Sequence, residues 1–376
     1  MSDQYWTTRL GQPDETDAVF QLVRTVHGNR YPELNRSYWQ WRYLSNEQFR
    51  ADIVMAEHKG RVIGIQPVTL FDFRWDDARL KGAMYTGVLT HPAHRRRGVF
   101  HSLVTSANEH AARRGAHFSI TMPNNASLPG FRRFGGWAYP GLIPLYVKVA
   151  NRSATPRPGA GRAAAELLGS IDRLCQVGRL CRVDRLCRVP RAMFRRPAAG
   201  RPQASLDVET VDQIPEELDE VAEPFARECA ALNIPRSAAY WNWRYCNKPA
   251  SAYRTLLARR GGQVVGAVVM SVGRRLRMEV GMILDLVASG GLVTIRELLH
   301  VAEQDFAARG VCLITCQATS PLLQQALSDE GYLRPPARLL PKRFHFVYHR
   351  TGAAGMSRNP NALSDWHLTF GDSDNA

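Results

Sequence analysis

The stretch THPAHRRRGVFHSLVTSANEHAARRGAHF, residues 90–118, places three consecutive arginines directly before a glycine and an amphipathic segment. The apolar run at residues 82–90 predicts a buried strand that ends before Pro92. After the arginines, apolar residues recur at helical spacing, at Phe100, Val104, Ala107 and Ala111, and Gly115 suits the end of that helix. The arginines are therefore predicted at a helix N-terminus, where free backbone N–H groups and the helix dipole favour an anion.

The glycine and the arginines favour one kind of anion over others. Gly98 has no side chain, so the backbone there can approach a ligand closely. Guanidinium groups add charge and paired donors that suit a pyrophosphate. A basic surface loop with a glycine turn is the alternative that the short match leaves open.

Composition and charge narrow the class of protein. The chain has 376 residues, 45% of them hydrophobic and 22% charged, which is enough for two domains with packed cores. Its net charge of +15 is concentrated in residues 151–205, which hold twelve arginines and three acidic residues. A nucleic-acid-binding surface over the whole protein is therefore not indicated, and we expect no nucleic-acid partner. The sequence shows neither a signal peptide nor an apolar membrane span, and with seven cysteines it predicts a cytoplasmic protein.

The chain carries an internal duplication. YWQWRY at residues 38–43 returns as YWNWRY at residues 240–245, and the glycine-rich turn at residues 60–64 returns at residues 262–266, both 202 positions later. Apolar runs flank each turn and predict β-hairpins. We therefore predict two copies of one α/β domain, residues 1–150 and 206–350, each with a mixed central sheet flanked by helices. The aromatic–arginine motif could line a pocket, but its presence in both copies favours core packing.

Two further segments flank the second copy. Residues 151–205 form a basic, arginine-rich linker with a six-residue repeat, which is typical of a helical spacer; contact of residues 173–196 with anionic lipid is the alternative. The cysteines in the repeat lack the close paired spacing of a zinc site, so no metal is predicted. Residues 351–376 form a C-terminal tail. Its default interpretation is disorder, although Trp366, Leu368 and Phe370 suggest docking.

After a predicted strand at residues 116–121 comes PNNASLPGFRRFGGW, residues 123–137. The order of hairpin, strand, arginine–glycine loop, helix, strand and Asn–Ser–Phe turn resembles the GCN5-related N-acetyltransferases (GNAT superfamily). The duplication and the His-Arg-Arg-Arg-Gly run are most similar to the Eis-like acetyltransferases of that superfamily. The acyl-CoA loop of the family corresponds to Arg95, Arg96, Arg97, Gly98, Val99 and Phe100, and its later motif corresponds to Asn124, Ser127 and Phe131.

This resemblance implies acetyl-CoA as co-substrate, with its pyrophosphate on the loop and its pantetheine along Val88, Leu89 and Thr90. It implies transfer of an acetyl group to a primary amine of a small molecule, such as an amino sugar or an amino acid derivative. The functional motifs occur only in the first copy. Gly290 and Gly291 in the second copy have no basic neighbours, which indicates a degenerate copy that shapes the substrate pocket or supports the first.

The sequence departs from the family pattern at two positions. Phe100 replaces a small residue, and Phe131 stands where a tyrosine often protonates the departing thiolate. Tyr139 and Tyr85 are the candidate replacements, and the strand at residues 82–90 offers no acidic base. In Eis-like enzymes the chain-terminal carboxylate acts as base, a role that Ala376 could take. The absent acid and base also leave open a non-catalytic CoA-binding or scaffold protein with a membrane-associating linker; oligomers are compatible with either interpretation.

Overall fold

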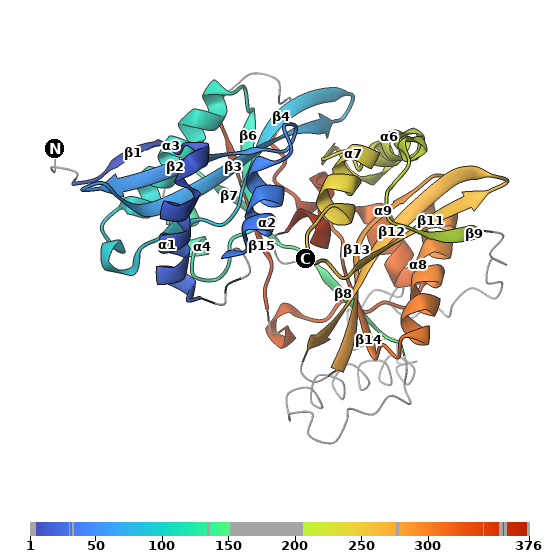
Figure 1. The fold of residues 1–376 in the computed structure, drawn as a ribbon. Coiled ribbons are helices and arrows are strands. Elements are labelled where there is room, and N and C mark those ends of the chain that lie inside the picture. Colours follow the sequence, from blue (N-terminus) through green and yellow to red (C-terminus); the bar gives the residue numbers. More distant parts are fainter. Residues whose placement is uncertain are drawn as a thin grey trace, which may run out of the picture.

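A computed structural model describes residues 5–150 and 206–373, apart from residues 30, 32–33, 134–135, 276–277, 341, 353–355 and 357–358. The basic linker, its segment 173–196 and Ala376 lie outside the described residues. No helix in the described part of the chain is both long and apolar enough to cross a membrane. Two mixed sheets with helices on their faces form two GNAT-like domains, which confirms the predicted fold class (Figure 1).

The first sheet has the strand order β1-β2-β3-β4-β6-β15-β7, with β5 and β10 also paired to β3. Alternating apolar residues build its hairpins, as predicted from the turn at residues 60–64. Its strands are β1 (Thr7–Leu10), β2 (Ala51–His58), β3 (Arg61–Trp75), β4 (Ala78–Tyr85), β5 (Leu89–Thr90), β6 (Phe118–Thr121), β7 (Ala138–Leu142), β10 (Leu232–Asn233) and β15 (His345–Arg350). The helices of this half are α1 (Thr16–His27), α2 (Arg36–Trp39), α3 (Val99–Arg113) and α4 (Leu128–Arg133).

The second sheet repeats this order as β9-β11-β12-β13-β14-β8. Its strands are β8 (Leu145–Val149), β9 (Asp207–Val211), β11 (Tyr253–Arg260), β12 (Gln263–Arg275), β13 (Met278–Ala288) and β14 (Leu313–Gln317). Its helices are α6 (Asp219–Cys229), α7 (Ala238–Trp241), α8 (Gly291–Ala308) and α9 (Pro321–Asp329).

The two halves exchange strands. β8, from the first half of the chain, pairs with β14 in the second sheet, and β15, from the end of the second half, pairs with β6 and β7 in the first sheet (Figure 1). Strands of each predicted domain, residues 1–150 and 206–350, thus pair within the sheet of the other domain. Each domain is therefore completed by a strand of the other half.

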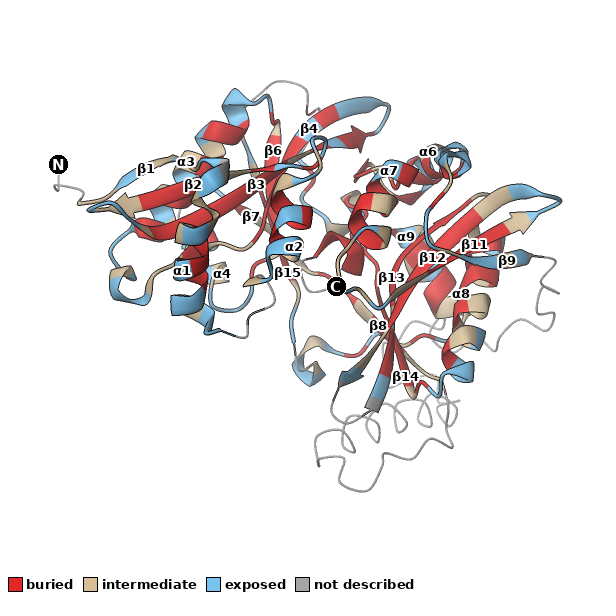
Figure 2. Ribbon diagram, in the orientation of Figure 1, coloured by how far each residue is buried: buried red, intermediate tan, exposed pale blue. Residues whose placement is uncertain are grey.

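A glycine in each half lets the long helix pack closely on its sheet. At Gly64 in β3, an added Cβ would lie 2.8 Å from the Leu103 side chain of α3 and 3.0 Å from the Leu89 carbonyl oxygen. At Gly266 in β12, it would lie 2.8 Å from the Leu298 side chain of α8 and 2.5 Å from the Val287 carbonyl oxygen. Figure 2 shows the buried strands and helix faces that result in both domains.

The duplicated aromatic motif joins the two halves. In each copy it runs from a short helix, α2 or α7, into a π-helical turn, Gln40–Leu44 or Asn242–Cys246. The indole N–H of Trp41 donates to the Trp243 carbonyl oxygen (2.5 Å), and the indole N–H of Trp243 donates to the Trp41 carbonyl oxygen (3.2 Å). The two rings are stacked with centroids 6.0 Å apart. Core packing between the copies explains why both carry the motif, and Tyr240 of the second copy also lines a cavity of about 430 Å³.

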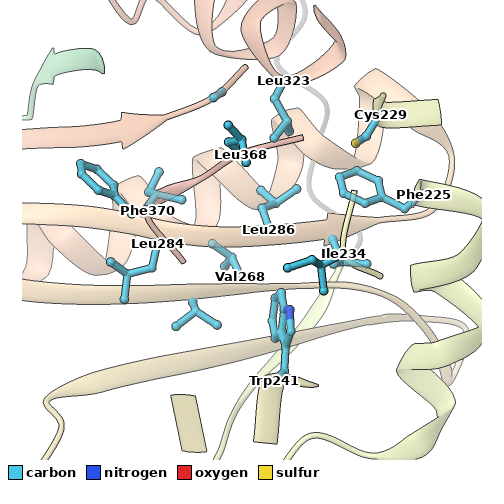
Figure 3. Close-up of a cluster of buried hydrophobic side chains, with 14 of the residues drawn as sticks. Phe225, Cys229, Ile234, Trp241, Val268, Leu284, Leu286, Leu323, Leu368 and Phe370 are labelled. Carbon is cyan, nitrogen blue, oxygen red and sulfur yellow. The ribbon is translucent and has the colours of Figure 1, made fainter. Parts of the chain in front are cut away.

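The C-terminal tail docks between the two domains, contrary to the default expectation of disorder: the Trp366 ring contacts Phe118, Phe346 and Tyr348 of the first sheet, and the residues after it pack on the second domain. Trp366, Leu368 and Phe370 are buried, with exposed fractions of 0%, 2% and 5%. Leu368 and Phe370 lie among side chains of β13, α6 and α9, as Figure 3 shows. Burying large apolar side chains gives this segment the hydrophobic stabilisation of a core element.

Candidate functional site

The arginine loop has the geometry expected of an anion site. Gly98 adopts a left-handed conformation (φ +95°) and is the N-cap of α3, so the first backbone N–H groups of a 15-residue helix are directed at the loop. Arg96 also has a positive φ of +61°. Arg95, Arg96 and Arg97 are exposed, and Arg97 lies over the Tyr5 ring with its guanidinium 5.5 Å from the ring centroid. The loop therefore presents three guanidinium groups at a helix N-terminus.

A cavity of about 240 Å³ lies where the ends of β4 and β6 meet the start of β15. Residues of both halves of the chain line it. The first half contributes His27, Tyr31, Gln66, Met84, Tyr85, Thr86, Gly87, Val88, Leu89, Ile120, Thr121, Met122, Pro123, Asn124, Ser127 and Phe131, and the second half contributes Lys342, Arg343, Phe344, Asp372 and Ser373.

A bulge between β4 and β5 forms one wall of the cavity. Tyr85 pairs with Val68 and Leu89 pairs with Ile65, so three residues of this strand, Thr86–Val88, face two residues of β3. The sequence predicted a single strand over residues 82–90 and gave no signal for this interruption. A bulge takes backbone groups out of the ladder and leaves them able to bind a ligand.

Gln66 lies beside the bulge and lines the cavity although it is fully buried. Its side-chain N–H groups donate to the carbonyl oxygens of Pro67 (2.8 Å) and Thr86 (3.2 Å), which fixes the orientation of the amide. The amide oxygen, and the buried hydroxyl of Thr86, have no hydrogen-bond partner among the described residues. Buried polar atoms without partners are rare in proteins, which makes these two atoms beside the cavity candidates for ligand contacts.

The two positions that depart from the family pattern contact each other. The rings of Phe100 and Phe131 pack edge to face with centroids 5.1 Å apart. Phe100 fits because Gly130 faces it, where an added Cβ would lie 2.6 Å from the Phe100 ring. Phe131 is buried between Phe100 and Trp137. An apolar pair with a compensating glycine therefore replaces the small residue and the tyrosine.

Comparisons with known proteins bear on this arrangement. Residues 7–139 match the family model described as an acetyltransferase (GNAT) domain. These residues form a GNAT domain. The match covers the first hairpin, the arginine loop, α3 and the Asn–Ser–Phe turn. It confirms the resemblance to the GNAT superfamily that these motifs indicated in the sequence. A search of curated proteins finds no relative of this chain by sequence.

Solved structures share the fold over most of the chain. A GCN5-related N-acetyltransferase from Anabaena variabilis is similar with a TM-score of 0.61 at 12% identity, and a probable N-acyltransferase from Enterococcus faecalis with a TM-score of 0.58 at 11% identity. Eis1 from Mycobacterium abscessus is similar with a TM-score of 0.53 at 16% identity. In each case the match covers 92% of this chain and 73% of the other. At these identities the likeness establishes the fold.

The remaining predicted cofactor residues surround the cavity of the GNAT domain. Val88, Leu89, Asn124, Ser127 and Phe131 line it, and Thr90 continues the same strand towards the arginine loop. The Asn124 side-chain oxygen accepts from the backbone N–H groups of Ala126 (3.0 Å) and Ser127 (2.9 Å) and so shapes the turn before α4. These contacts explain the Asn–Ser spacing by local structure and leave binding as a prediction.

The two candidate tyrosines have different surroundings. Tyr85 is buried, and its hydroxyl donates to Asn108 (2.8 Å) and accepts from Ser119 (3.1 Å). The Tyr139 hydroxyl lies 2.9 Å from Nδ1 of His345, a residue of the exchanged strand β15. Burial raises the pKa of Tyr139, opposed by the charges of Arg132 and Arg343, and burial lowers the pKa of His345.

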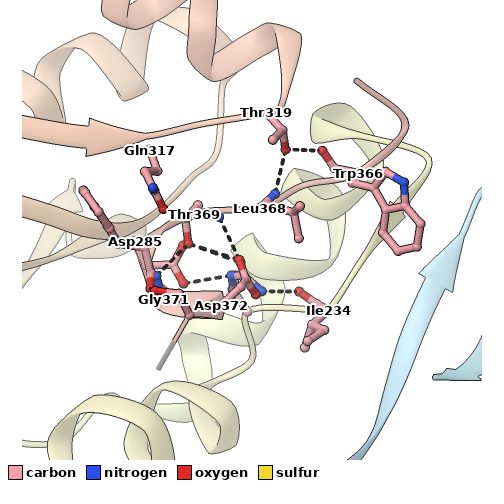
Figure 4. Close-up of polar contacts among 12 residues, drawn as sticks. Ile234, Asp285, Gln317, Thr319, Trp366, Leu368, Thr369, Gly371 and Asp372 are labelled. Carbon is pink, nitrogen blue, oxygen red and sulfur yellow. Dashed lines mark hydrogen bonds and ion pairs between the residues drawn. The ribbon is translucent and has the colours of Figure 1, made fainter. Parts of the chain in front are cut away.

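In the second domain, the cleft equivalent to this cavity is occupied by the C-terminal segment. Residues 366–373 lie between β13 and the end of β14, where the Leu368 N–H donates to the Thr319 hydroxyl (2.8 Å) and the Thr319 N–H donates to the Leu368 carbonyl oxygen (3.3 Å). Figure 4 shows these contacts and the neighbouring Asp285 and Asp372. The second copy therefore lacks both the basic loop and an open cleft.

A buried ion cluster fixes this segment. The Arg236 guanidinium binds Asp285 (2.8 Å) and Asp372 (2.6 Å), and all three side chains are at most 2% exposed. Arg244 donates to the carbonyl oxygens of Gly371 (2.9 Å) and Ser373 (2.7 Å). Asp372 and Ser373 thereby reach the cavity of the first domain. Arg244 belongs to the duplicated motif at residues 240–245, whereas Arg236, Asp285 and Asp372 belong to no motif identified from sequence.

Proposed function

We propose that the chain is an acetyl-CoA-dependent N-acyltransferase acting on a primary amine of a small molecule. The observation that carries the proposal is the continuity of three features: the arginine loop at the N-terminus of α3, the bulged strand Thr86–Thr90, and the adjoining cavity with unpartnered polar atoms. The loop suits a pyrophosphate, the strand suits an extended amide-containing arm, and the cavity has room for an acyl group and an amine.

In the proposed reaction, the neutral amine nitrogen attacks the thioester carbonyl carbon. The carbon–sulfur bond of the tetrahedral intermediate then breaks, which gives an amide and the CoA thiolate. A backbone N–H of the bulge stabilises the oxyanion through a fixed dipole. The amine loses its proton to water, because the only acidic side chain among the described cavity residues, Asp372, is bound to Arg236.

The proton for the thiolate is proposed to come from Tyr139. Its hydroxyl is half-buried and linked to His345, whose Nε2 lies 2.8 Å from the side-chain oxygen of Asn125, next to the cavity residue Asn124. Neutral His345 can donate from Nε2 to Asn125 and accept at Nδ1 from Tyr139. Tyr139 is not among the cavity-lining residues, so its O–H has to turn from His345 towards the cavity to protonate the thiolate. The hydroxyl of Tyr85, in contrast, is held against α3 by Asn108. Tyr139→Phe should therefore lower kcat, whereas Tyr85→Phe should mainly lower stability.

Calorimetric titration with acetyl-CoA tests the binding part of the proposal. We expect saturable binding by the wild type and a loss of at least about tenfold in affinity in the Arg95→Ala/Arg97→Ala variant, since hydrogen bonds to charged groups contribute about 1.5–3 kcal/mol each. Arg113→Ala, an exposed arginine at the other end of α3, is the matched control. Absence of binding by the wild type would refute the proposal. Binding with no acetylated product from a panel of amines would favour a CoA-binding scaffold instead.

A further inference from the structure

The charge of the cavity indicates what kind of amine it accepts. Its basic side chains on the second-half wall are Lys342 and Arg343, both exposed. Its acidic side chain, Asp372, has an exposed fraction of 1% and is neutralised by Arg236. A polycationic acceptor would meet like charges on this wall, with no available carboxylate among the described lining residues. An anionic group would be attracted there.

The wall that carries Lys342 and Arg343 lies away from the arginine loop. The strand order is β3, β4, β6, β15, and the loop follows β5, which pairs with β3. Lys342 and Arg343 directly precede β15, whose start lies beside the end of β6. The arginine loop and the pair Lys342–Arg343 are thus on opposite sides of the opening between β4 and β6. With Arg95–Arg97 assigned to the pyrophosphate in the proposed function, Arg343 is left to serve the acceptor.

The amine end of the acceptor has a matching partner. The Gln66 side-chain oxygen is buried beside the bulge, and its orientation is fixed because both amide hydrogens are donated to carbonyl oxygens. An N–H of the incoming amine would satisfy this oxygen once a shift of the cavity wall exposes it, since the atom is fully buried in the free protein. The acceptor would then extend from Gln66 at the bulge to Arg343 at the start of β15.

Resting on the proposed function, we infer that the acceptor is an amine that also carries a carboxylate or phosphate group, with the anion bound by Arg343 and Lys342 and the amine oriented by Gln66. An amino acid or a phosphorylated amine has this chemistry. An aminoglycoside-like polycation, which the family resemblance alone would have allowed, does not.

The test compares amines that differ only in the anionic group. Phenylalanine against phenethylamine, glutamate against 4-aminobutyrate, and glucosamine 6-phosphate against glucosamine are titrated into the CoA-saturated protein by calorimetry, with kanamycin as the polycation. We expect at least one pair in which the more anionic member binds about 10–100 times more tightly, the range of one hydrogen-bonded charge pair. Arg343→Gln should abolish that difference and leave the acetyl-CoA affinity unchanged. Arg338→Gln, at an exposed arginine outside the cavity lining, should change neither.

The outcomes separate this inference from the proposed function. If acetyl-CoA itself does not bind, the proposed function fails. If acetyl-CoA binds but no anionic member is preferred, or kanamycin binds best, this inference alone is overturned. A weaker acetyl-CoA affinity in Arg343→Gln, with the pair preference intact, would assign Arg343 to the cofactor and also overturn it. Gln66→Glu, of similar shape, gives a second readout, because a new charge beside the bulge should change KM for the acceptor.

Discussion

The ion cluster around Arg236 lets us predict the consequence of removing a single charge from the second domain. Arg236→Met keeps an unbranched side chain but leaves two buried carboxylates, Asp285 and Asp372, without their cation. Breaking a buried ion pair by removing one partner costs about 3–5 kcal/mol, because the remaining charge stays desolvated. Since typical domains are stable by about 5–15 kcal/mol, the variant should lose a large part of its stability.

The loss should depend on pH. Burial raises the pKa of Asp285, and the Arg236 charge opposes that rise. Without the guanidinium the pKa rises further, so the folded variant takes up a proton more readily than the unfolded chain. A group whose pKa is raised by folding contributes stability below its unfolded pKa and loses that contribution as pH rises. The difference in the free energy of unfolding between the wild type and Arg236→Met should therefore become smaller as pH falls from 7 towards 5.

Urea unfolding at pH 7 and pH 5, followed by tryptophan fluorescence, measures both effects. Arg227→Met is the matched control: its side chain is 60% exposed and its ion pair with Glu223 is 3.7 Å long, so we expect a change within about 0.5 kcal/mol. Replacing both aspartates by asparagine in Arg236→Met should recover part of the loss. The assignment of a buried cation to this cluster would be refuted if Arg236→Met lowered the free energy of unfolding by less than about 1 kcal/mol. It would also be refuted if that loss did not change with pH.

Three further predictions follow from the packing. A chain of residues 1–150 lacks β15, which leaves one edge of β6 unpaired and β7 without a partner strand, so circular dichroism should show no cooperative thermal transition; a sharp transition would contradict the strand exchange. Gly130→Ala should lower Tm and weaken acetyl-CoA binding severalfold because its Cβ would meet Phe100, and Phe100→Ala in the same chain should restore both; an additive loss would argue against that contact. Trp41→Phe removes the indole donor and should cost about 1–3 kcal/mol in urea unfolding by leaving the Trp243 carbonyl oxygen unpaired, whereas an unchanged midpoint would mean that water takes its place.

Local patterns were enough to predict much of the fold. The 202-residue repeat predicted two similar domains, and the arginine–glycine stretch predicted a loop and a helix that the structure has before and at α3; the single strand predicted at residues 82–90 is divided into β4 and β5 by the bulge. The strand exchange was beyond such reasoning, because β8 and β15 read equally well as strands of their own halves. Pairing between segments about 200 residues apart is decided by the final packing, which local periodicity does not encode.

The residues of the candidate site also fall into two groups, those that a local sequence pattern indicates and those that only long-range packing brings to the cavity. The loop and the Asn–Ser–Phe turn are contiguous in sequence, so each of their residues could be named as a candidate, and their role in binding stays a prediction. Gln66 carries no such signal, because its importance comes from a bulge one strand away that orients its amide. Arg343 and Asp372 are ordinary charged residues in sequence, and only the exchange of β15 and the docking of the C-terminal segment bring them to a cavity more than 200 positions away.

These long-range contributions give a physical reason for keeping a second domain that has no basic loop. Its own cleft is filled by residues 366–373, so it offers no open site equivalent to the first. The same docked segment carries Asp372 and Ser373 to the first cavity, and the strand that leaves the second domain carries Lys342 and Arg343 there. The half of the chain that lacks the arginine loop thus builds the wall opposite it. Changes in the second domain should therefore alter acceptor choice while the acetyl-CoA affinity stays the same.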